Sequence, residues 1–394
     1  MGSGGREHAL AWKLSQAQTL DELHAAPGNP GIATLGTCHP VRAEDGDGLL
    51  DLASSIDADL VIVGPEAPLV AGVADELRHL GHAVFGPSRT GARIEGSKSF
   101  AKDVMRAAGV PTAEALSVAR APCVIKADGL AAGKGVFVCQ DQRELDDALR
   151  AVAAFGDAIV IEELLEGEEI SAFALCDGAR AIPLPPAQDF KRIGDGDQGP
   201  NTGGMGSYSP VAADADELVE TIHQPVLDEL AERGAPFVGV LFAGVMVTPD
   251  GPRVLEFNCR FGDPETQSLL PRLEGDVLEL LAAAAHGDLS GVTVEVAENA
   301  AVTVVLAARD YPAQGDTGSP IDGIADAETA GALVFHAGTA LHGDRIVTNG
   351  GRILNVTGIG RNVAEARDRA YAACDLITFP GMRCRRDIAA VAHV

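Results

Sequence analysis

Aromatic residues are scarce in this 394-residue chain, at 4% of the sequence, although 46% of the residues are hydrophobic. The core must therefore be built mainly from Ala, Val, Leu and Ile. No apolar run approaches the ~20 residues of a membrane-spanning helix. The seven cysteines include no C-x-x-C pair, which argues against a zinc ribbon or a disulfide scaffold and favours reduced thiols. Met1 leads directly into a glycine loop without a signal peptide, and we expect a cytoplasmic protein.

Positive charge is also scarce, because 30 basic residues stand against 57 acidic ones and the formal net charge is −27. This balance argues against nucleic acid as a partner, since such binding depends on neutralising phosphates. It also argues against binding to an anionic membrane surface. At ~100–200 residues per domain, the length predicts two to four domains.

Lysine is the rarest basic residue, with six against 24 arginines. A GC-rich genome explains this scarcity well but explains the placement less well, because four of the six lie in or beside glycine-containing motifs. A lysine is a flexible point charge and an arginine a planar fork, so these positions predict sites that arginine would not fit. Lys13 is expected on the exposed side of the first helix. The six are Lys13, Lys98, Lys102, Lys126, Lys134 and Lys191.

The N-terminal quarter of the chain, residues 1–97, has the pattern of β/α units. A continuous apolar run at 60–63 predicts a buried parallel strand, and 84–87 predicts another. Ser97 is expected to cap a helix that ends at Gly109.

Strands dominate from residue 123 onward. The Gly/Pro/Asp-rich stretch 185–210 shows little periodicity, which is typical of a functional or disordered loop. A domain boundary is expected at 288–300, and the last hundred residues predict short strands and a helix near 363–376.

A glycine loop, Gly2-Ser3-Gly4-Gly5-Arg6-Glu7-His8, precedes the first helical pattern. Backbone N–H groups at such a helix N-terminus can bind phosphate. The evidence is weak, because the usual context requires a strand in front of the loop and only Met1 stands there. A simple turn explains the glycines about equally well.

The stretch Val124–Val136 places two lysines around a Gly/Ala hairpin between two strands. It is not a P-loop, which puts G-K-[ST] before a helix. A flexible glycine hairpin suits a flap that folds over a nucleoside triphosphate, and a tight hairpin with a solvated lysine is the alternative. The candidate residues are Lys126, Gly129, Gly133, Lys134 and Gly135.

An apolar strand at 159–162 leads into an acidic turn and a second strand. A linker between strands can read the edge of an adenine through its backbone, and a nearby carboxylate can bind ribose hydroxyls. A solvated acidic turn is the alternative, and from this stretch alone it is favoured.

The stretch 254–266 gives the strongest prediction. Side chains alternate along a strand, so Glu256, Asn258 and Arg260 share one face. Magnesium prefers oxygen ligands, often only one or two of them from protein, and the first two residues fit that role. Arg260 would then face a transferring phosphoryl group. The alternative is the polar outer face of an edge strand; Cys259, by alternation, is a buried thiol rather than a nucleophile.

Two motifs lie inside the stretch 185–210. One is QDFKR, which includes Asp189, and the other is GPNTGGMG, which runs from 199 to 206. Three glycines in four positions favour a close approach of backbone to a ligand, and a mobile surface loop is an equally good interpretation.

In order, these motifs resemble the phosphoribosylamine–glycine ligase (glycinamide ribonucleotide synthetase) family of the ATP-grasp superfamily. The resemblance runs nearly end to end. The matching stretches are GSGGREHALAWKL, APGNPG, VGPEAPLVAGV, EGSKSFAK, VIKADGLAAGKGV, EELLEGEE, QDFKR, GPNTGGMGSYSP, EFNCRFGDPETQ, YP, FHAGT, TNGGRILNVTG and CRRDI.

The resemblance implies a multi-domain α/β fold and a reaction. The expected parts are an N-terminal open parallel α/β domain at 1–97, a central ATP-grasp domain of two α+β lobes at 98–293 with a lid at about 112–180, and a small β-rich domain at 294–394. ATP would phosphorylate glycine, and the amine of 5-phosphoribosylamine would attack the glycyl phosphate. Products are glycinamide ribonucleotide, ADP and phosphate, in de novo purine biosynthesis.

The family's residue roles carry over by position. Lys98 and Lys126 would contact ATP phosphates, residues 129–135 would form the flap, and Glu169 would bind the ribose. The adenine hinge would include Glu162, Glu163 and Leu164. Glycine and phosphoribosylamine would be bound by Gly4, Gly5, Arg6, Pro65, Glu66, Asp189, Asn201, Gly203, Gly204 and Met205. The Mg²⁺ or Mn²⁺ ligands would be Glu256 and Asn258, the catalytic residues would be Arg260 and Lys126, and the protein would be a monomer or homodimer.

This sequence departs from the family pattern in two places. The family begins with a buried strand before the glycine loop, and we expect that the natural chain begins a few residues before Met1. The stretch 114–122 is also short, which affects only the lid. A non-catalytic nucleotide-binding protein and an ATP-grasp ligase for another amine are the alternative interpretations.

Overall fold

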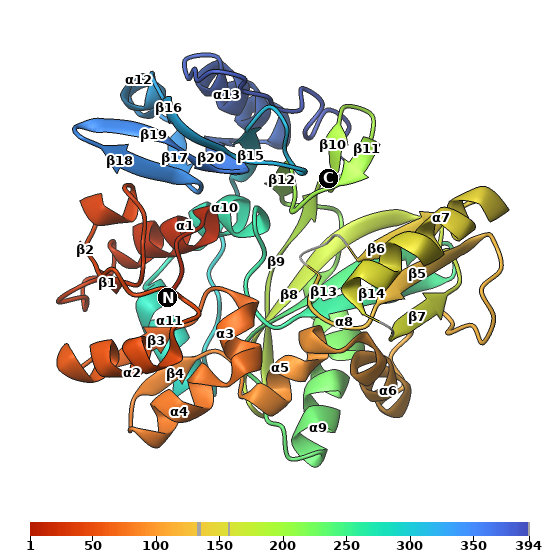
Figure 1. Ribbon diagram of the computed structural model, residues 1–394. Helices are drawn as coiled ribbons and strands as arrows, with labels where there is room; N and C mark the ends of the chain where they lie inside the picture. Colours follow the sequence, from red (N-terminus) through yellow and green to blue (C-terminus); the bar gives the residue numbers. More distant parts are fainter. Residues whose placement is uncertain (132–134, 157, 393–394) are drawn as a thin grey trace.

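The structure is a computed structural model that describes residues 1–131, 135–156 and 158–392 (Figure 1). Gly133 and Lys134, two of the predicted flap residues, lie outside the described residues. No helix within the described ranges is both long enough and apolar enough to span a membrane.

Two short parallel strand pairs form the N-terminal part, as the β/α pattern predicted. β1 (His24–Ala25) pairs with β2 (Thr37–Cys38), and β3 (Leu60–Ile62) pairs with β4 (Ala83–Phe85). The helices around them are α1 (Gly5–Leu14), α2 (Gly46–Ser55), α3 (Glu66–Ala71), α4 (Val73–His79) and α5 (Arg89–Gly96), with a 3₁₀ turn at Ile32–Thr34.

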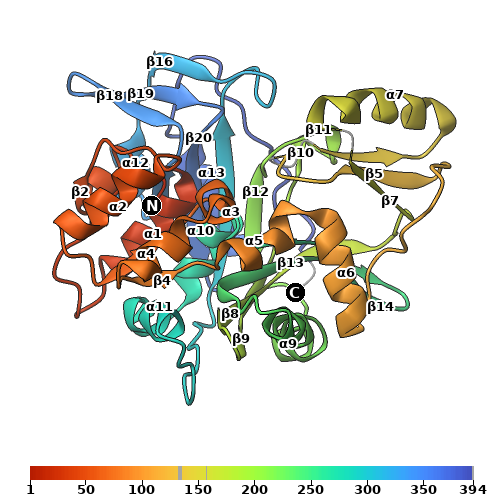
Figure 2. The ribbon, with the colours of Figure 1, turned by 60° about the horizontal axis from the view of Figure 1, so that its bottom comes forward.

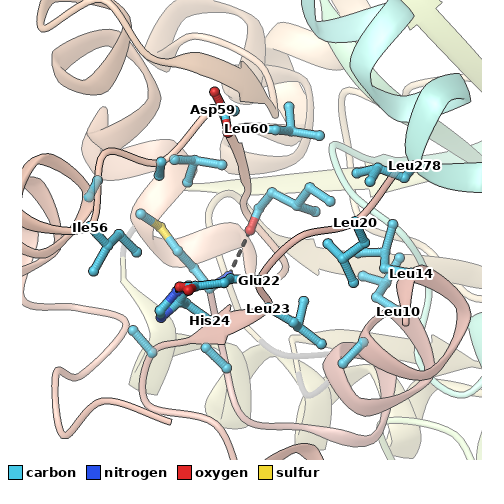
Figure 3. A pocket seen from close by; sticks show the side chains of 18 of the residues that line it. Leu10, Leu14, Leu20, Glu22, Leu23, His24, Ile56, Asp59, Leu60 and Leu278 are labelled. Carbon is cyan, nitrogen blue, oxygen red and sulfur yellow. Dashed lines mark hydrogen bonds and ion pairs between the residues drawn. The ribbon is translucent and has the colours of Figure 1, made fainter. Parts of the chain in front are cut away.

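Met1 and Gly2 join the two pairs. The Met1 amine donates to the Ile62 carbonyl at 2.7 Å, and the Gly2 amide donates to the Ala26 carbonyl at 2.7 Å. Beside this junction lies a cavity of about 830 Å³, between α1, α2 and the edges of β1 and β3, whose lining combines apolar side chains with Glu22, His24 and Asp59 (Figure 3). Side chains around it include Leu10, Leu14, Leu20, Leu23, Ile56, Leu60 and Leu278.

The predicted helix after Ser97 is confirmed as α6 (Lys98–Ala108). The Ser97 hydroxyl accepts from the Phe100 amide at 3.2 Å, and Gly109 ends the helix with φ 70°. The expectation that Lys13 is exposed is wrong, because its ammonium donates to the Leu273 carbonyl at 2.6 Å and burial lowers its pKa.

A small antiparallel sheet stands apart from the rest of the molecule (Figure 2). Its order is β6 (Val136–Cys139), β5 (Cys123–Ala127) and β7 (Ile159–Glu162), and α7 (Gln142–Val152) packs on it. We call this unit the lid sheet. Its own small core contains Cys123, Ile125 and Leu145, so it packs as a separate unit.

The largest sheet has eight antiparallel strands. Their order is β14 (Gly251–Asn258), β13 (Val238–Thr248), β8 (Glu168–Asp177), β9 (Ala181–Asp189), β12 (Gly206–Ser209), β15 (Ala300–Ala307), β20 (Arg352–Gly360) and β17 (Leu333–His336). The last three strands belong to the C-terminal hundred residues. The central and C-terminal parts therefore share one sheet, joined where β12 pairs with β15.

Shorter elements cover this sheet and its edges. The remaining strands are β10 (Arg192–Gly194), β11 (Gln198–Asn201), β16 (Asp316–Pro320), β18 (Thr339–His342) and β19 (Arg345–Gly350). The remaining helices are α8 (Ala215–Leu218), α9 (Gln224–Glu232), α10 (Glu265–Leu269), α11 (Val277–Ala285), α12 (Ile324–Thr329) and α13 (Val363–Cys374), with short helical turns at Ala153–Phe155, Val219–His223 and Leu270–Arg272.

The expectation of an irregular loop at 185–210 is wrong. This stretch contains the end of β9, the hairpin of β10 and β11, and β12. The hairpin is held by tertiary contacts to the C-terminal segment, which periodicity within the stretch cannot reveal.

Candidate active site

A cavity of about 1090 Å³ lies between the lid sheet and the large sheet. It brings together most of the predicted site residues: Arg6, Pro65, Glu66, Lys98, Lys126, Gly129, Gly135, Glu162, Glu163, Leu164, Glu169, Asp189, Asn201, Gly203, Glu256, Asn258 and Arg260. Four predicted residues, Gly4, Gly5, Gly204 and Met205, do not line it. Which ligand each lining residue contacts stays a prediction.

Two lysines share one buried carboxylate in the wall between the two sheets. Glu162, at the end of β7, lies 2.6 Å from the Lys126 ammonium and 2.8 Å from the Lys102 ammonium, and it is 2% exposed. Burial lowers the pKa of Lys102, although Glu162 opposes the shift. Of the two lysines, Lys126 lines the cavity, whereas Lys102 does not. Sequence reasoning missed Lys102; its spacing of four from Lys98 on α6 was the available indication.

A second cluster joins predicted ribose and metal residues through Lys191. Its ammonium pairs with Glu169 and lies 3.8 Å from Glu256. Burial alone lowers the pKa of Lys191, but Glu169, Asp189 and Glu256 raise it well above its usual range. Burial raises the pKa of Glu256, but the nearby cations, Lys191 first, bring it below its usual value, so this carboxylate is ionised.

Asp189 behaves in the opposite way. Burial raises its pKa well above the usual range; Lys191 opposes this shift, and Glu265, Glu169 and Glu256 add to it. The wall thus contains two carboxyl groups whose pKa values are shifted in opposite directions, Glu256 downward and Asp189 upward.

Arg260 lies between two carboxylates. Its guanidinium is 3.3 Å from Glu66 and 3.0 Å from Glu95. Glu95 also accepts from the Cys259 amide at 2.8 Å, and burial raises its pKa although Arg260 opposes the shift. Glu95 opens the EGSKSFAK motif but was not predicted as a site residue. Cys259 is 1% exposed and burial raises the pKa of its thiol, which confirms the expected inert cysteine.

The N-terminal glycine loop directs its amide at the protein itself. The Gly4 amide donates to the Glu7 carboxylate at 2.6 Å, and this carboxylate also pairs with Arg6 at 2.7 Å. A Cβ on Gly5 would lie 2.1 Å from the Asn355 side chain, so this glycine is needed for packing against β20. Arg6 alone reaches the cavity, and it donates to the Phe261 carbonyl at 3.1 Å.

The loop 201–206 is held by the C-terminal part of the chain. The Gly203 amide donates to the Tyr311 hydroxyl at 2.9 Å, and Arg352 donates to the carbonyls of Gly203 and Asp263, the latter at 2.8 Å. Met205 is fully buried in a small core with Ile193, Ala307 and Tyr311. Tyr311 lies in the YP motif and Arg352 in TNGGRILNVTG, but the sequence predicted no role for either residue.

No three-residue cluster of His, Cys, Asp and Glu able to hold a metal occurs in residues 1–131, 135–156 and 158–392. The candidate donors are instead Glu256 and Asn258, and the Asn258 side chain makes no hydrogen bond to any described residue. One carboxylate and one amide oxygen form a small hard-donor set of the type that leaves coordination positions to water and phosphate.

Comparisons with known proteins identify the class and then the family. The sequence matches the ATP-grasp (A) domain of phosphoribosylglycinamide synthetase over residues 96–266, the N domain over 1–95 and the C domain over 301–391. The fold is therefore that of an ATP-grasp ligase, which uses ATP. The biotin carboxylase domain of the Hydrogenobacter thermophilus 2-oxoglutarate carboxylase, with a TM-score of 0.71 at 17% identity over 97% of this chain and 90% of that one, shares the fold.

Closer similarity defines the family. The phosphoribosylamine–glycine ligase of Streptomyces coelicolor is 51% identical over 100% of this chain and 98% of its own length, and that of Mesorhizobium japonicum is 49% identical over 98% and 96%. The crystal structure of the Thermotoga maritima ligase has a TM-score of 0.83 at 34% identity, over 98% of both chains. The chain belongs to the phosphoribosylamine–glycine ligase family and carries out that ATP-dependent ligation in purine biosynthesis, which sets aside both alternative interpretations.

Proposed function

We propose that the ligation proceeds through glycyl phosphate in the cavity of about 1090 Å³, with Glu256 and Asn258 as ligands of a Mg²⁺ or Mn²⁺ ion. The main support is the ionised Glu256 beside the Asn258 amide, which pairs with none of the described residues, on a wall that also holds Lys98, Lys126 and Arg260. A divalent ion at this pair would neutralise charge that develops on the transferring phosphoryl group.

The residues around the cavity then have separate tasks. The ammonium groups of Lys98 and Lys126 hold the phosphates of ATP, and the lid sheet with the predicted flap 129–135 excludes water from a reactive acyl phosphate. A glycine carboxylate oxygen takes the terminal phosphoryl group and ADP leaves. The amine of phosphoribosylamine then attacks the glycyl carbon, loses a proton and displaces phosphate.

We propose that Arg6, Pro65, Glu66, Asp189, Asn201 and Gly203 bind glycine and phosphoribosylamine, since they line the same cavity as Lys98 and Lys126. Arg260 is the candidate catalytic cation; Glu66 and Glu95 fix its guanidinium at the cavity wall. The nucleotide is assigned to Glu162, Glu163, Leu164 and Glu169 together with Gly129 and Gly135.

The compartment and assembly are part of the same proposal. All seven cysteines are free, which suits a reducing cytoplasm. We propose a monomer or homodimer, which sedimentation of the purified protein distinguishes.

Substitution of the metal pair tests the proposal. Glu256→Gln and Asn258→Leu should each lower ADP formation with all three substrates present by at least about 100-fold, because several kcal/mol of charge stabilisation are lost. Asp250→Asn, at the exposed turn between β13 and β14, is the matched control and should keep normal turnover. Near-normal ADP formation by both site variants at saturating Mg²⁺ would contradict the assignment.

A further inference from the structure

Arg385, in the C-terminal segment, is the largest fully buried side chain of the described residues, with 1% exposure. Its guanidinium forms a two-pronged pair with Asp387, at 2.8 and 2.7 Å. It also donates to the Asp197 carboxylate at 2.7 Å and to the Arg192 carbonyl at 3.1 Å. The guanidinium carbon lies 5.0 Å from the centre of the Phe190 ring. A charge buried this deeply is stable only because each of its partners is in place.

Apart from the pair with Asp387, these contacts of the Arg385 side chain go to one hairpin, residues 190–201, which contains β10 and β11. The Asp387 carboxylate accepts from the Gly196 amide at 2.8 Å, and the Arg386 amide donates to Asp195 at 2.8 Å. Asp197 has φ 54°, a left-handed conformation that a non-glycine residue adopts at an energetic cost. Three consecutive residues, 385–387, thus hold the turn of this hairpin in place.

The same hairpin carries Lys191. The residues on either side of Lys191, Phe190 and Arg192, both contact Arg385. The Lys191 carbonyl accepts from the amide and the hydroxyl of Thr202, both at 2.8 Å. The Lys191 ammonium pairs with Glu169 and lies 3.8 Å from Glu256 inside the cavity. A shift of the hairpin would move this cation away from the two carboxylates.

We propose that Arg385 is a positioning residue for Lys191: by fixing the hairpin 190–201 it keeps the Lys191 ammonium against Glu169 and Glu256. The C-terminal segment is therefore part of the active site's support. The kinetic consequence rests on the proposed nucleotide site, to which both Glu169 and Glu256 belong, whereas the geometric dependence of Lys191 on Arg385 does not.

A double-mutant cycle tests the inference. Arg385→Met and Lys191→Met should each lower kcat/KM for MgATP about 10–100-fold, the range found when supporting partners of a site are removed. The double variant should have about the same kcat/KM as the more impaired of the two single variants, because both changes remove the same ammonium from its place. Arg386→Met removes the same charge from the next residue, which is half-exposed and pairs with Asp375, and it should leave kcat/KM unchanged.

Two further readouts separate positioning from general stability. Arg385→Lys keeps the positive charge but loses the planar guanidinium that makes two hydrogen bonds to Asp387. This variant should therefore fold and still show a raised KM for MgATP. If Arg385→Met does not fold, the same cycle is run with Arg385→Lys. The proposal would be overturned if the double variant lost kcat/KM by the product of the two single losses. It would also be overturned if Arg385→Met lowered the melting temperature and left kcat/KM unchanged. Full activity of Glu256→Gln would refute the metal assignment alone, because the cycle between Arg385 and Lys191 does not depend on it.

Discussion

Replacement of Glu162 by glutamine tests whether this carboxylate serves the fold or the nucleotide. Its two oxygens lie 2.6 Å from the Lys126 ammonium and 2.8 Å from the Lys102 ammonium, with Glu162 2% exposed. The uncharged glutamine amide would leave the Lys102 and Lys126 ammonium groups buried without a counter-charge, since their other hydrogen-bond partners are neutral oxygens. Removing one partner of a buried ion pair destabilises a protein by about 3–5 kcal/mol. That is a large part of a typical free energy of unfolding of ~5–15 kcal/mol.

The neighbouring residue supplies the control. Glu163 is one-third exposed and pairs with Arg253 at 2.9 Å, so Glu163→Gln should lower the free energy of unfolding by only ~0–1 kcal/mol. Urea unfolding of both variants at pH 7.5 measures the difference, and ATP titrations of the folded variants measure nucleotide binding. Equal unfolding free energies, together with a raised KM for ATP in Glu162→Gln alone, would refute the structural role of the carboxylate.

Two further predictions concern parts of the protein away from the active-site cavity. Burial lowers the pKa of His223 to about 4 from an ordinary 6.5, so the unfolded chain takes up a proton between these values that the folded chain refuses, and stability falls as the pH drops. His223→Gln should lessen the loss of unfolding free energy between pH 7 and 5 by up to about 2 kcal/mol in urea titrations, while His286→Gln, at an exposed position, should not; parallel curves for both would contradict this. Five apolar residues added before Met1 should extend the parallel pairing into the cavity of about 830 Å³ between β1 and β3 and raise the melting temperature by several degrees. A Gly/Ser extension of equal length is the control, and equal melting of the two would contradict the prediction.

The part of the site that sequence reasoning predicted follows from local rules. Alternation along β14 placed Glu256 and Asn258 on one side, and both line the same cavity with Arg260. The order of strand, glycine hairpin and strand around Lys126 likewise predicted the antiparallel pair of β5 and β6 in the lid sheet. Side-chain direction in a strand depends on the next one or two residues, so a single sequence determines it.

The residues for which the sequence predicted no role depend on contacts between distant segments. Lys102 pairs with Glu162, Glu95 with Arg260 and Lys191 with Glu169. Their own neighbours give no periodic pattern that indicates a buried charge. The same reason explains why 185–210 looked irregular although it contains a hairpin, since its order depends on Arg385.

Two of the glycines that were predicted to bind substrate also have a packing role within the protein. A glycine indicates that something comes close to its Cα, and this is true at Gly5 and at Gly204, where a Cβ would lie 2.1 Å from Asn355 and 2.4 Å from Pro264. Gly204 also has φ +104°, which a side chain would strain. In both cases the close neighbour is protein. These contacts let α1 and the loop 201–206 approach β20 and the Asp263 loop, and that approach brings Arg6 and Gly203 to the cavity wall. Composition therefore located the close packing, while the identity of the packed partner is a property of the tertiary structure alone.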